Sequence, residues 1–298
     1  MRFYHFVINP KSGTGNAQQQ RALIEKFFSG RAEKMAIHFT EYPGHAHELA
    51  LELGKTKEDV IVCVGGDGSI NEIARALMNK PATLGVIPVG SGNGLARHLG
   101  IPLKSILALE ELVKDHSIAM DVGELNGHPF FVTAGIGFEA EVAYLFSKRS
   151  IRGILGYTSE AVKLFPQYRS KTYRISTPDG DRDTQAFSLT VANSSQYGNN
   201  AIIAKHASVM DGLLDLSIIH SYPKILGPQI GLSLMTNNLH QSKYYESEQI
   251  TRVQIHGTEG EKKTHAHIDG DSVLLTYPLE AIIRPKCLNV IVPKNKIV

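Results

Sequence analysis

Residues 60–72 read VIVCVGGDGSINE, and this stretch decides the class of fold. Val60–Val64 is a continuous run of apolar, mostly β-branched residues, which is typical of a strand buried on both faces of a parallel sheet. Glycines follow directly at 65, 66 and 68, and a helical pattern covers Ile70–Met78. A buried strand, a glycine-rich turn and a helix in this order predict one repeat of an α/β sheet.

The same alternation continues on both sides of this stretch. It predicts an open, mostly parallel, doubly wound sheet, in which ligands bind at the carboxyl ends of the strands. The further strands are expected at Phe3–Ile8, Met35–Phe39 and Leu84–Ile87, and the further helices at Ala17–Phe28, His45–Leu53, Gly94–Leu99 and Lys104–Val113.

The pattern changes near residue 119. Short β-rich runs separated by Gly, Pro, Asp and Asn then predict antiparallel strands in a sandwich or barrel. We therefore expect an α/β domain at 1–119, to which a last strand in 285–298 returns, and a β-rich domain at 120–284. The β-rich runs are Pro129–Gly135, Thr172–Thr177, Ala186–Ala192, Leu213–Ile219, Val253–His256, His265–Ile268 and Val273–Tyr277.

The composition excludes several classes of protein. The chain has 298 residues, of which 42% are hydrophobic and 20% charged, as in ordinary globular domains. A net charge of +2 is too small to predict a nucleic-acid partner. Cys63 and Cys287 stand in apolar runs without metal-ligand spacing, which favours a reducing, cytoplasmic location. Since no run approaches 18 apolar residues, we expect any membrane contact to be peripheral, at the inner face. The oligomeric state stays open, a dimer included.

Three glycine-rich loops each follow a predicted strand. They read NPKSGTG at 9–15, GGDGSINE at 65–72 and PVGSGNG at 88–94. Glycine lets backbone N–H groups approach an anion, and the start of a helix adds positive potential. The loops contain neither GxxxxGK[ST] nor a complete GxGxxG. Together they predict a phosphate-binding site of another kind.

These loops and two later motifs resemble the diacylglycerol kinase catalytic family of lipid kinases, which includes bacterial soluble lipid kinases and sphingosine kinases. The later motifs are ASVMDGLLDL at 207–216 and IDGD at 268–271. The resemblance covers the whole chain. It implies an NAD-kinase-like α/β domain, a β-sandwich domain and an ATP- and Mg²⁺-dependent kinase of lipid metabolism. The acceptor would be a hydroxyl of diacylglycerol or of a sphingoid base.

The resemblance also implies which residues bind the nucleotide and the metal. Asp67 would organise Mg²⁺ and water near the γ-phosphate. Asp211 would hold a structural Mg²⁺ together with backbone carbonyls such as those of Ser208 and Leu213. The nucleotide site would consist of Asn9, Pro10, Lys11, Ser12, Gly13, Thr40, Gly65, Gly66, Asp67, Gly68, Ser69, Ile70, Asn71, Glu72 and Ser91.

Asp269 and Asp271 match the DG-acid motif of that family, whose last acid is taken as the proton acceptor. A lipid hydroxyl is a poor nucleophile until a carboxylate accepts its proton. A solvated Asp-Gly-Asp turn explains the same residues without any catalysis. Which of the two acids is the base stays open. Gly94 stands where many bacterial members have an acid, and the loop is closer to the sphingosine kinase version.

Residues 143–174 form a basic segment. It holds seven Lys or Arg and six aromatic residues, against the single acid Glu160. Such a run is usually a solvated helix face. Given a lipid substrate, it predicts peripheral contact with an anionic bilayer, because basic and interfacial aromatic side chains both favour that surface.

Two other functions are compatible with part of the pattern. NAD kinases share GGDG and the two-domain plan, but the loop at 88–94 and the DG-acid motif argue against that function. A non-catalytic nucleotide- or lipid-binding regulator would not need Asp67, Asp269 and Asp271.

Overall fold

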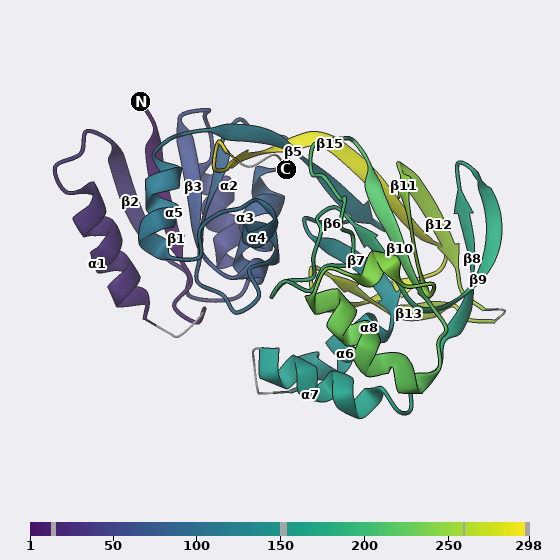
Figure 1. Ribbon diagram of the computed structural model, residues 1–298. Coiled ribbons are helices and arrows are strands. Elements are labelled where there is room, and N and C mark those ends of the chain that lie inside the picture. Colours follow the sequence, from purple (N-terminus) through teal and green to yellow (C-terminus); the bar gives the residue numbers. More distant parts are fainter. Residues whose placement is uncertain (13–15, 150–153, 259, 296–298) are drawn as a thin grey trace. The chain divides into compact units, whose positions relative to one another are not determined.

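The computed structural model describes residues 1–12, 16–149, 154–258 and 260–295, and the chain divides into two compact units (Figure 1). Unit 1 comprises Met1–Asp121 and Pro285–Val298, and unit 2 comprises Val122–Arg284. The chain passes between the units within two strands, β5 (Ser117–Leu125) and β15 (Leu279–Ile291).

Unit 1 is built on a parallel sheet in the order β2-β1-β3-β4-β15. Residues 60–64 of the central strand β3 are all 0% exposed, so both faces of the sheet are covered. This is why the sequence there is continuously apolar rather than alternating. The first four strands are β1 (Phe3–Ile8), β2 (Lys34–Phe39), β3 (Asp59–Gly65) and β4 (Thr83–Pro88).

The helices of unit 1 follow the strands in sequence. Helix α1 packs against α5, and α2 packs against α3. Their bounds are α1 (Ala17–Phe28), α2 (His45–Leu53), α3 (Asp67–Leu77), α4 (Gly94–His98) and α5 (Ser105–Leu112). The expected doubly wound α/β architecture is confirmed.

Unit 2 is a β sandwich in which the long strand β9 joins two sheets. Its first half pairs with β8, and its second half pairs with β7 and β10. Alternate residues such as Leu189 and Val191 point into the apolar core between the sheets. The strands are β6 (His128–Phe130), β7 (Thr133–Gly137), β8 (Lys171–Thr177), β9 (Gly180–Ala192), β10 (Leu214–His220), β11 (Tyr245–Ile250), β12 (Arg252–His256), β13 (Lys263–Ile268) and β14 (Asp271–Thr276).

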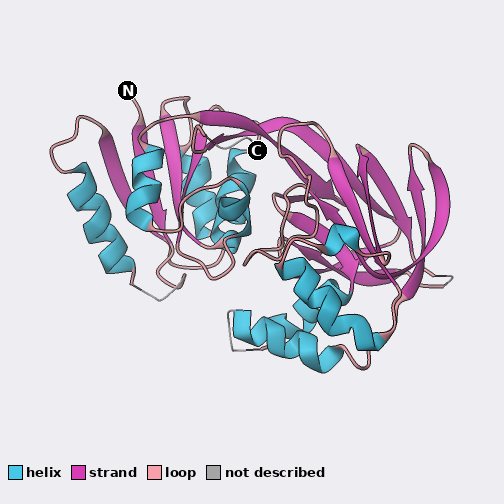
Figure 2. Ribbon diagram, viewed as in Figure 1, coloured by secondary structure: helices cyan, strands magenta, loops and turns pink. Residues whose placement is uncertain are grey.

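Three α-helices gather on one side of unit 2 (Figure 2). They are α6 (Phe138–Ser147), α7 (Ile154–Leu164) and α8 (Gly227–Met235), and two short 3₁₀ helices cover Lys224–Leu226 and Leu239–Gln241. A second apolar cluster underlies this layer. It includes Phe187 of β9, Tyr168 and Ile230 of α8. The β-rich second part of the chain is therefore confirmed, with a helical layer added.

Several details differ from the sequence-based expectation. Strand β9 begins at Gly180 and not at Ala186, and β5 and β11 were not expected. The run Pro129–Gly135 is not one strand but parts of β6 and β7, because the chain turns at Phe131 and Val132. Helix α3 begins at Asp67 and not at Ile70, since Gly66 is its N-cap and residues 67–69 already form its first turn.

Candidate functional site

The three glycine-rich loops leave one edge of the unit 1 sheet. Gly65 pairs with Pro88 at the ends of β3 and β4, and Ile8 pairs with Val64 at the ends of β1 and β3. Because these strands are parallel neighbours, their carboxyl ends lie side by side. The register therefore brings the starts of all three loops together.

The second and third loops touch backbone to backbone. A Cβ atom added to Gly90 would lie 2.5 Å from the Cα of Gly66. A Cβ added to Gly65 would lie 2.6 Å from the Cβ of Ser69. Neither distance is tolerable for a side chain, so glycine at 65 and 90 is needed for close packing of the loops.

Asn9 links the first loop to the second. Its Nδ2 donates to Ser69 Oγ at 2.8 Å, and its Oδ1 accepts the N–H of Lys11 at 2.9 Å. The N–H of Thr40 donates to the carbonyl of Ile8 at 3.0 Å, which places this buried residue at the same edge. The structure thus brings Asn9, Thr40 and Ser69 to the carboxyl ends of neighbouring strands.

Asp67 belongs to the second loop and faces the third. A Cβ added to Gly92 would lie 2.9 Å from its Oδ2. Burial raises the pKa of Asp67, and the N–H groups of Gly94, Leu95 and Asn93 only partly offset that increase. Its Oδ1 is buried without a hydrogen-bond partner. A buried carboxylate oxygen without a partner fits the hard oxygen ligand that Mg²⁺ prefers.

The other predicted nucleotide residues differ in exposure. Pro10, Lys11, Gly68 and Ser91 are exposed, whereas Ser12, Asn71 and Glu72 are half-buried. Ile70 is 1% exposed and belongs to the core, so its side chain supports the loop from below. Gly13 lies outside the described residues.

In unit 2, Asp269 and Gly270 form the two-residue turn between β13 and β14. Their φ values are 49° and 91°, and Ile268 pairs with Asp271 across the hairpin. Asp-Gly with two positive φ angles is the favoured sequence for a type I′ hairpin turn. Asp269 and Gly270 therefore do form a turn, as one of the two explanations of this motif predicted.

The two acids of the motif have different surroundings. The carboxylate of Asp269 accepts the N–H groups of Phe131 at 3.0 Å, Val132 at 2.8 Å and Thr133 at 3.1 Å. Accepting a proton would cost Asp269 these bonds, so its carboxylate is suited to holding the turn. Asp271 is exposed at the first position of β14. Of the two acids, Asp271 is the one that a substrate could reach.

Asp211 lies in the loop before β10. Its Oδ1 accepts the N–H of Leu213 at 3.0 Å, and Ser208 Oγ accepts the N–H of Met210 at 3.3 Å. Burial, with a smaller contribution from the charge of Asp211, raises the pKa of Asp215 to about 6. In the described part of the chain, no three His, Cys, Asp or Glu side chains gather as a metal site. A structural Mg²⁺ here would depend on backbone carbonyls, and that role stays a prediction.

Sequence reasoning missed a buried polar cluster on the helical side of unit 2. It centres on Glu139, in the first turn of α6, whose pKa burial raises to about 7. Ser188 and Tyr197 face it, and His267 is 3% exposed nearby. The sequence signal was the alternation Gly135-Ile136-Gly137, followed after one aromatic residue by Glu139.

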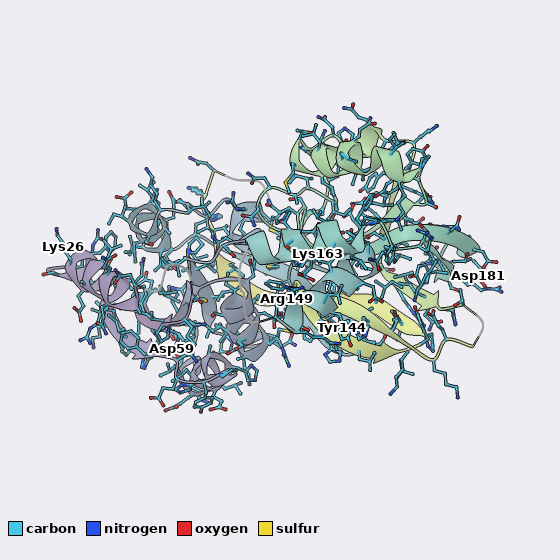
Figure 3. The ribbon with its side chains drawn as sticks, turned by 90° about the horizontal axis from the view of Figure 1, so that it is seen from below. Lys26, Asp59, Tyr144, Arg149, Lys163 and Asp181 are labelled. Atoms are coloured by element: carbon cyan, nitrogen blue, oxygen red, sulfur yellow. The ribbon has the colours of Figure 1, made fainter. Side chains whose placement is uncertain are left out.

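The basic segment is partly neutralised by its own contacts. Arg149 and Lys163 both pair with Glu160, at 2.9 and 3.4 Å. Lys148 lies 4.0 Å from the ring centre of Tyr144, which belongs to α6. Tyr144, Arg149 and Lys163 are labelled in Figure 3. Arg152 lies outside the described residues. The free positive charge of the segment is therefore smaller than its composition indicates.

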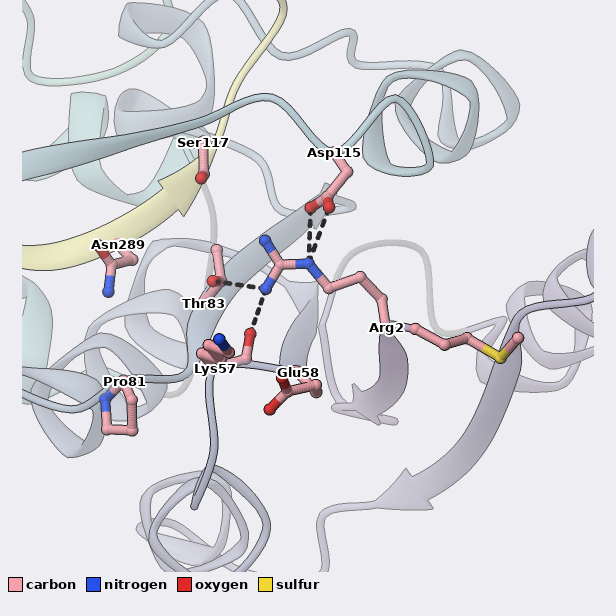
Figure 4. Close-up of a pocket in the computed structure, with 9 residues that line it drawn as sticks. Arg2, Lys57, Glu58, Pro81, Thr83, Asp115, Ser117 and Asn289 are labelled. Atoms are coloured by element: carbon pink, nitrogen blue, oxygen red, sulfur yellow. Dashed lines mark hydrogen bonds and ion pairs between the residues drawn. The ribbon is translucent and has the colours of Figure 1, made fainter.

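A depression of about 440 Å³ lies elsewhere in unit 1, at the amino ends of the strands (Figure 4). Arg2 spans it and is bound on several sides. Its Nε donates to both oxygens of Asp115 at 2.9 Å, and its Nη1 donates to the carbonyl of Lys57. Because the guanidinium of Arg2 is already paired, it offers little attraction to an anionic ligand. The depression also lies at the edge of the sheet opposite the glycine-rich loops.

Within residues 1–12, 16–149, 154–258 and 260–295, no helix combines the length and apolar character needed to span a bilayer.

Comparison with known proteins identifies both parts of the chain. Residues 4–125 match the description "Diacylglycerol kinase catalytic domain". Residues 132–292 match "YegS C-terminal NAD kinase beta sandwich-like domain". The family resemblance is thereby confirmed over nearly the whole sequence.

Similar proteins match along their full length. "Diacylglycerol kinase" of Bacillus subtilis (strain 168) is 28% identical over 305 residues, covering 99% of this chain and 98% of that protein. "Probable lipid kinase YegS-like" of Pseudomonas aeruginosa is 28% identical, covering 94% and 91%. A crystal structure of a diacylglycerol kinase from Bacillus anthracis str. Sterne has the same fold, with a TM-score of 0.76 at 20% identity, covering 99% and 98%. The chain belongs to the lipid kinase family that joins a diacylglycerol kinase catalytic domain to a YegS-type C-terminal β-sandwich domain.

Proposed function

We propose that this protein transfers the γ-phosphoryl group of ATP to a hydroxyl of a lipid, either a diacylglycerol or a sphingoid base. The observation that carries the proposal is Asp67 of the second loop, a half-buried acid that faces the third loop and has one buried oxygen without a partner. Phosphoryl transfer depends mainly on positioning and charge neutralisation, and this arrangement serves both.

The loops of unit 1 bind the nucleotide. Their backbone N–H groups face the phosphates, and Asn9 and Ser69 fix the distance between the first two loops. Lys11 is exposed on the first loop and supplies a cation for the phosphates. Asp67 would hold Mg²⁺, which would supply charge neutralisation to the transferred phosphoryl group.

Asp271 of unit 2 accepts the proton of the lipid hydroxyl. The hydroxyl oxygen attacks the γ-phosphorus, the bond to the β–γ bridging oxygen breaks, and ADP leaves. Asp269 is a positioning residue, because its carboxylate ties the hairpin to the backbone at 131–133.

The enzyme works at the inner surface of a membrane, to which it binds peripherally from the cytoplasm. Exposed apolar side chains on and beside the helical layer of unit 2 support this proposal: Val162, Ile225, Leu232 and Met235 are 67%, 87%, 63% and 54% exposed. The basic segment 143–174 adds lysines near the same helices. Apolar and basic side chains together favour an anionic bilayer.

Radiolabelled ATP and Mg²⁺ test the activity. The protein is incubated with dioleoylglycerol or sphingosine in mixed micelles and, separately, with NAD. A labelled lipid supports the proposal. Labelled NADP without labelled lipid would identify an NAD kinase. ATP binding without transfer to either lipid, or to a total lipid extract, would identify a regulator.

A further inference from the structure

One sheet face of unit 2 carries a row of polar and small residues. His267 of β13 pairs with Gly135 of β7, Gly135 with Thr190 of β9, and Thr190 with Ser217 of β10. The residues on either side of Thr190 in sequence, Leu189 and Val191, point to the apolar core. The row therefore lies on the opposite face, outside the sandwich core.

Two glycines on this face make room for close neighbours. A Cβ on Gly135 would come within 3.1 Å of His267 Nε2 and 2.4 Å of a backbone oxygen. Gly137 pairs with Ser188 and is the N-cap of α6. Glycine at 135 thus leaves room for the imidazole of His267, which lies directly over the strand there.

Glu139 and two tyrosines border this part of the sheet face. Tyr197 Oη lies 2.7 Å from Thr190 Oγ1, and its ring meets that of His267 edge-on at 6.0 Å. The hydroxyl of Tyr157 donates to the carbonyl of Glu139 at 3.3 Å. Glu139 and both tyrosines are half-buried, so the border has contact with the exterior.

Three buried polar atoms within this border lack a well-formed hydrogen bond, namely Glu139 Oε2, Ser188 Oγ and His267 Nε2. The hydroxyls of Ser188 and Tyr197 lie close enough to the Glu139 carboxylate to offset part of the rise in its pKa. Native proteins almost always satisfy such atoms, with ordered water if not with protein groups. An acceptor, a hydroxyl and an imidazole nitrogen together can bind a group that both donates and accepts hydrogen bonds.

We propose that Glu139, Ser188 and His267 bind the polar backbone of the acceptor lipid, meaning a hydroxyl with an adjacent ester or amine. This inference rests on the proposed function. Strand β13 connects the cluster to the catalytic hairpin, since Asp269 follows His267 by two residues, or about 7 Å along a strand. A lipid held here by its polar backbone would lie close to the hairpin that bears Asp271.

The test compares Glu139→Gln and Ser188→Ala with wild type and with Glu246→Gln. Glu246 lies on β11 and is absent from the cluster, so its variant controls for the loss of an acid in unit 2. The KM for dioleoylglycerol, the KM for sphingosine and the KM for ATP are measured in mixed micelles, with the melting temperature of each variant. We expect Glu139→Gln to raise the KM for a lipid at least tenfold and to change the KM for ATP less than twofold.

Comparing dioleoylglycerol with sphingosine shows which polar group the cluster binds. A larger loss with dioleoylglycerol assigns the cluster to the glyceride backbone, and a larger loss with sphingosine assigns it to the amino alcohol. Unchanged lipid KM values in both cluster variants would overturn the inference. They would indicate that the polar atoms of the cluster bind only ordered water. A wild-type protein that labels no lipid would instead overturn the proposed function.

Discussion

Asp67 combines two properties that conflict in a purely structural residue. It is an acid whose charged form is penalised by burial, yet one of its oxygens has no partner. We expect Asp67→Asn to lower phosphoryl transfer by about 10²–10³-fold, as when other groups that stabilise transition-state charge are removed. The melting temperature should stay unchanged or rise, because the variant no longer buries a carboxylate. A variant that retains near wild-type turnover would mean that the nucleotide loop is wrongly assigned.

Asp269 and Asp271, the two acids of the β13–β14 hairpin, should respond differently when each is replaced by Asn. Asp271→Asn removes the proposed proton acceptor from an exposed position, so turnover should fall about 10²–10⁴-fold without loss of stability. Asp269→Asn puts an amide NH₂ against backbone donors and should destabilise the fold by about 1–3 kcal/mol. Asn tolerates the φ of 49°, so the backbone is not the cause. Turnover and thermal melting are measured for both variants. If Asp271→Asn is active and Asp269→Asn is stable but inactive, Asp269 is the proton acceptor and Asp271 is not.

Glu139 predicts how stability depends on pH. Burial raises its pKa from 4.5 to about 7, so the folded state holds its proton more tightly than the unfolded chain. The free energy of unfolding should therefore fall as the pH rises from 4.5 to 7, by up to about 3 kcal/mol. Glu139→Gln should remove this decline, and its stability relative to wild type should increase between pH 5 and pH 8. Urea unfolding followed by circular dichroism measures both proteins, and parallel curves would contradict the assignment.

At the scale of elements, the contact between the second and third glycine-rich loops limits which residues can replace glycine there. Gly90→Ala would place a Cβ 2.5 Å from the Cα of Gly66, and neither backbone can move cheaply. We expect a loss of about 1–3 kcal/mol in stability and a higher KM for ATP. Gly68→Ala is the control for stability, because nothing lies within 4 Å of its added Cβ. Equal melting temperatures for the two variants would show that the loops separate readily.

The elements also show what can be predicted from sequence. The apolar run at 60–64 predicted a fully buried strand, because burial on both faces leaves no place for polar alternation. The division of Pro129–Gly135 could not be predicted. The backbone at 131–133 turns to donate to Asp269, more than 130 residues later in the sequence. The polar row through His267 and Thr190 likewise depends on strand register, which no local pattern specifies.

At the scale of the whole molecule, a lipid substrate requires contact with a bilayer. The exposed apolar residues beside α8 have no acid near them in sequence, since residues 216–245 contain neither Asp nor Glu. Ile225, Leu232 and Met235 can therefore enter an interface without bringing a negative charge toward anionic lipids. Lys148 and Lys163 would each add at most about 1 kcal/mol of attraction close to the surface, and Lys163 less because it also pairs with Glu160.

Co-sedimentation with vesicles of phosphatidylcholine and phosphatidylserine measures this contact. We expect binding at low salt and weaker binding at 1 M salt, where the Debye length is about 3 Å. Replacing Leu232 and Met235 with Ser should reduce binding at both salt concentrations, because apolar transfer is not screened. Replacing Lys148 and Lys163 with Glu should reduce it mainly at low salt. Leu107→Ser in α5 of unit 1 is the control, since Leu107 is also exposed but lies outside unit 2. If the four unit 2 substitutions together leave vesicle binding at the level of this control, the helical layer is not the membrane-binding surface.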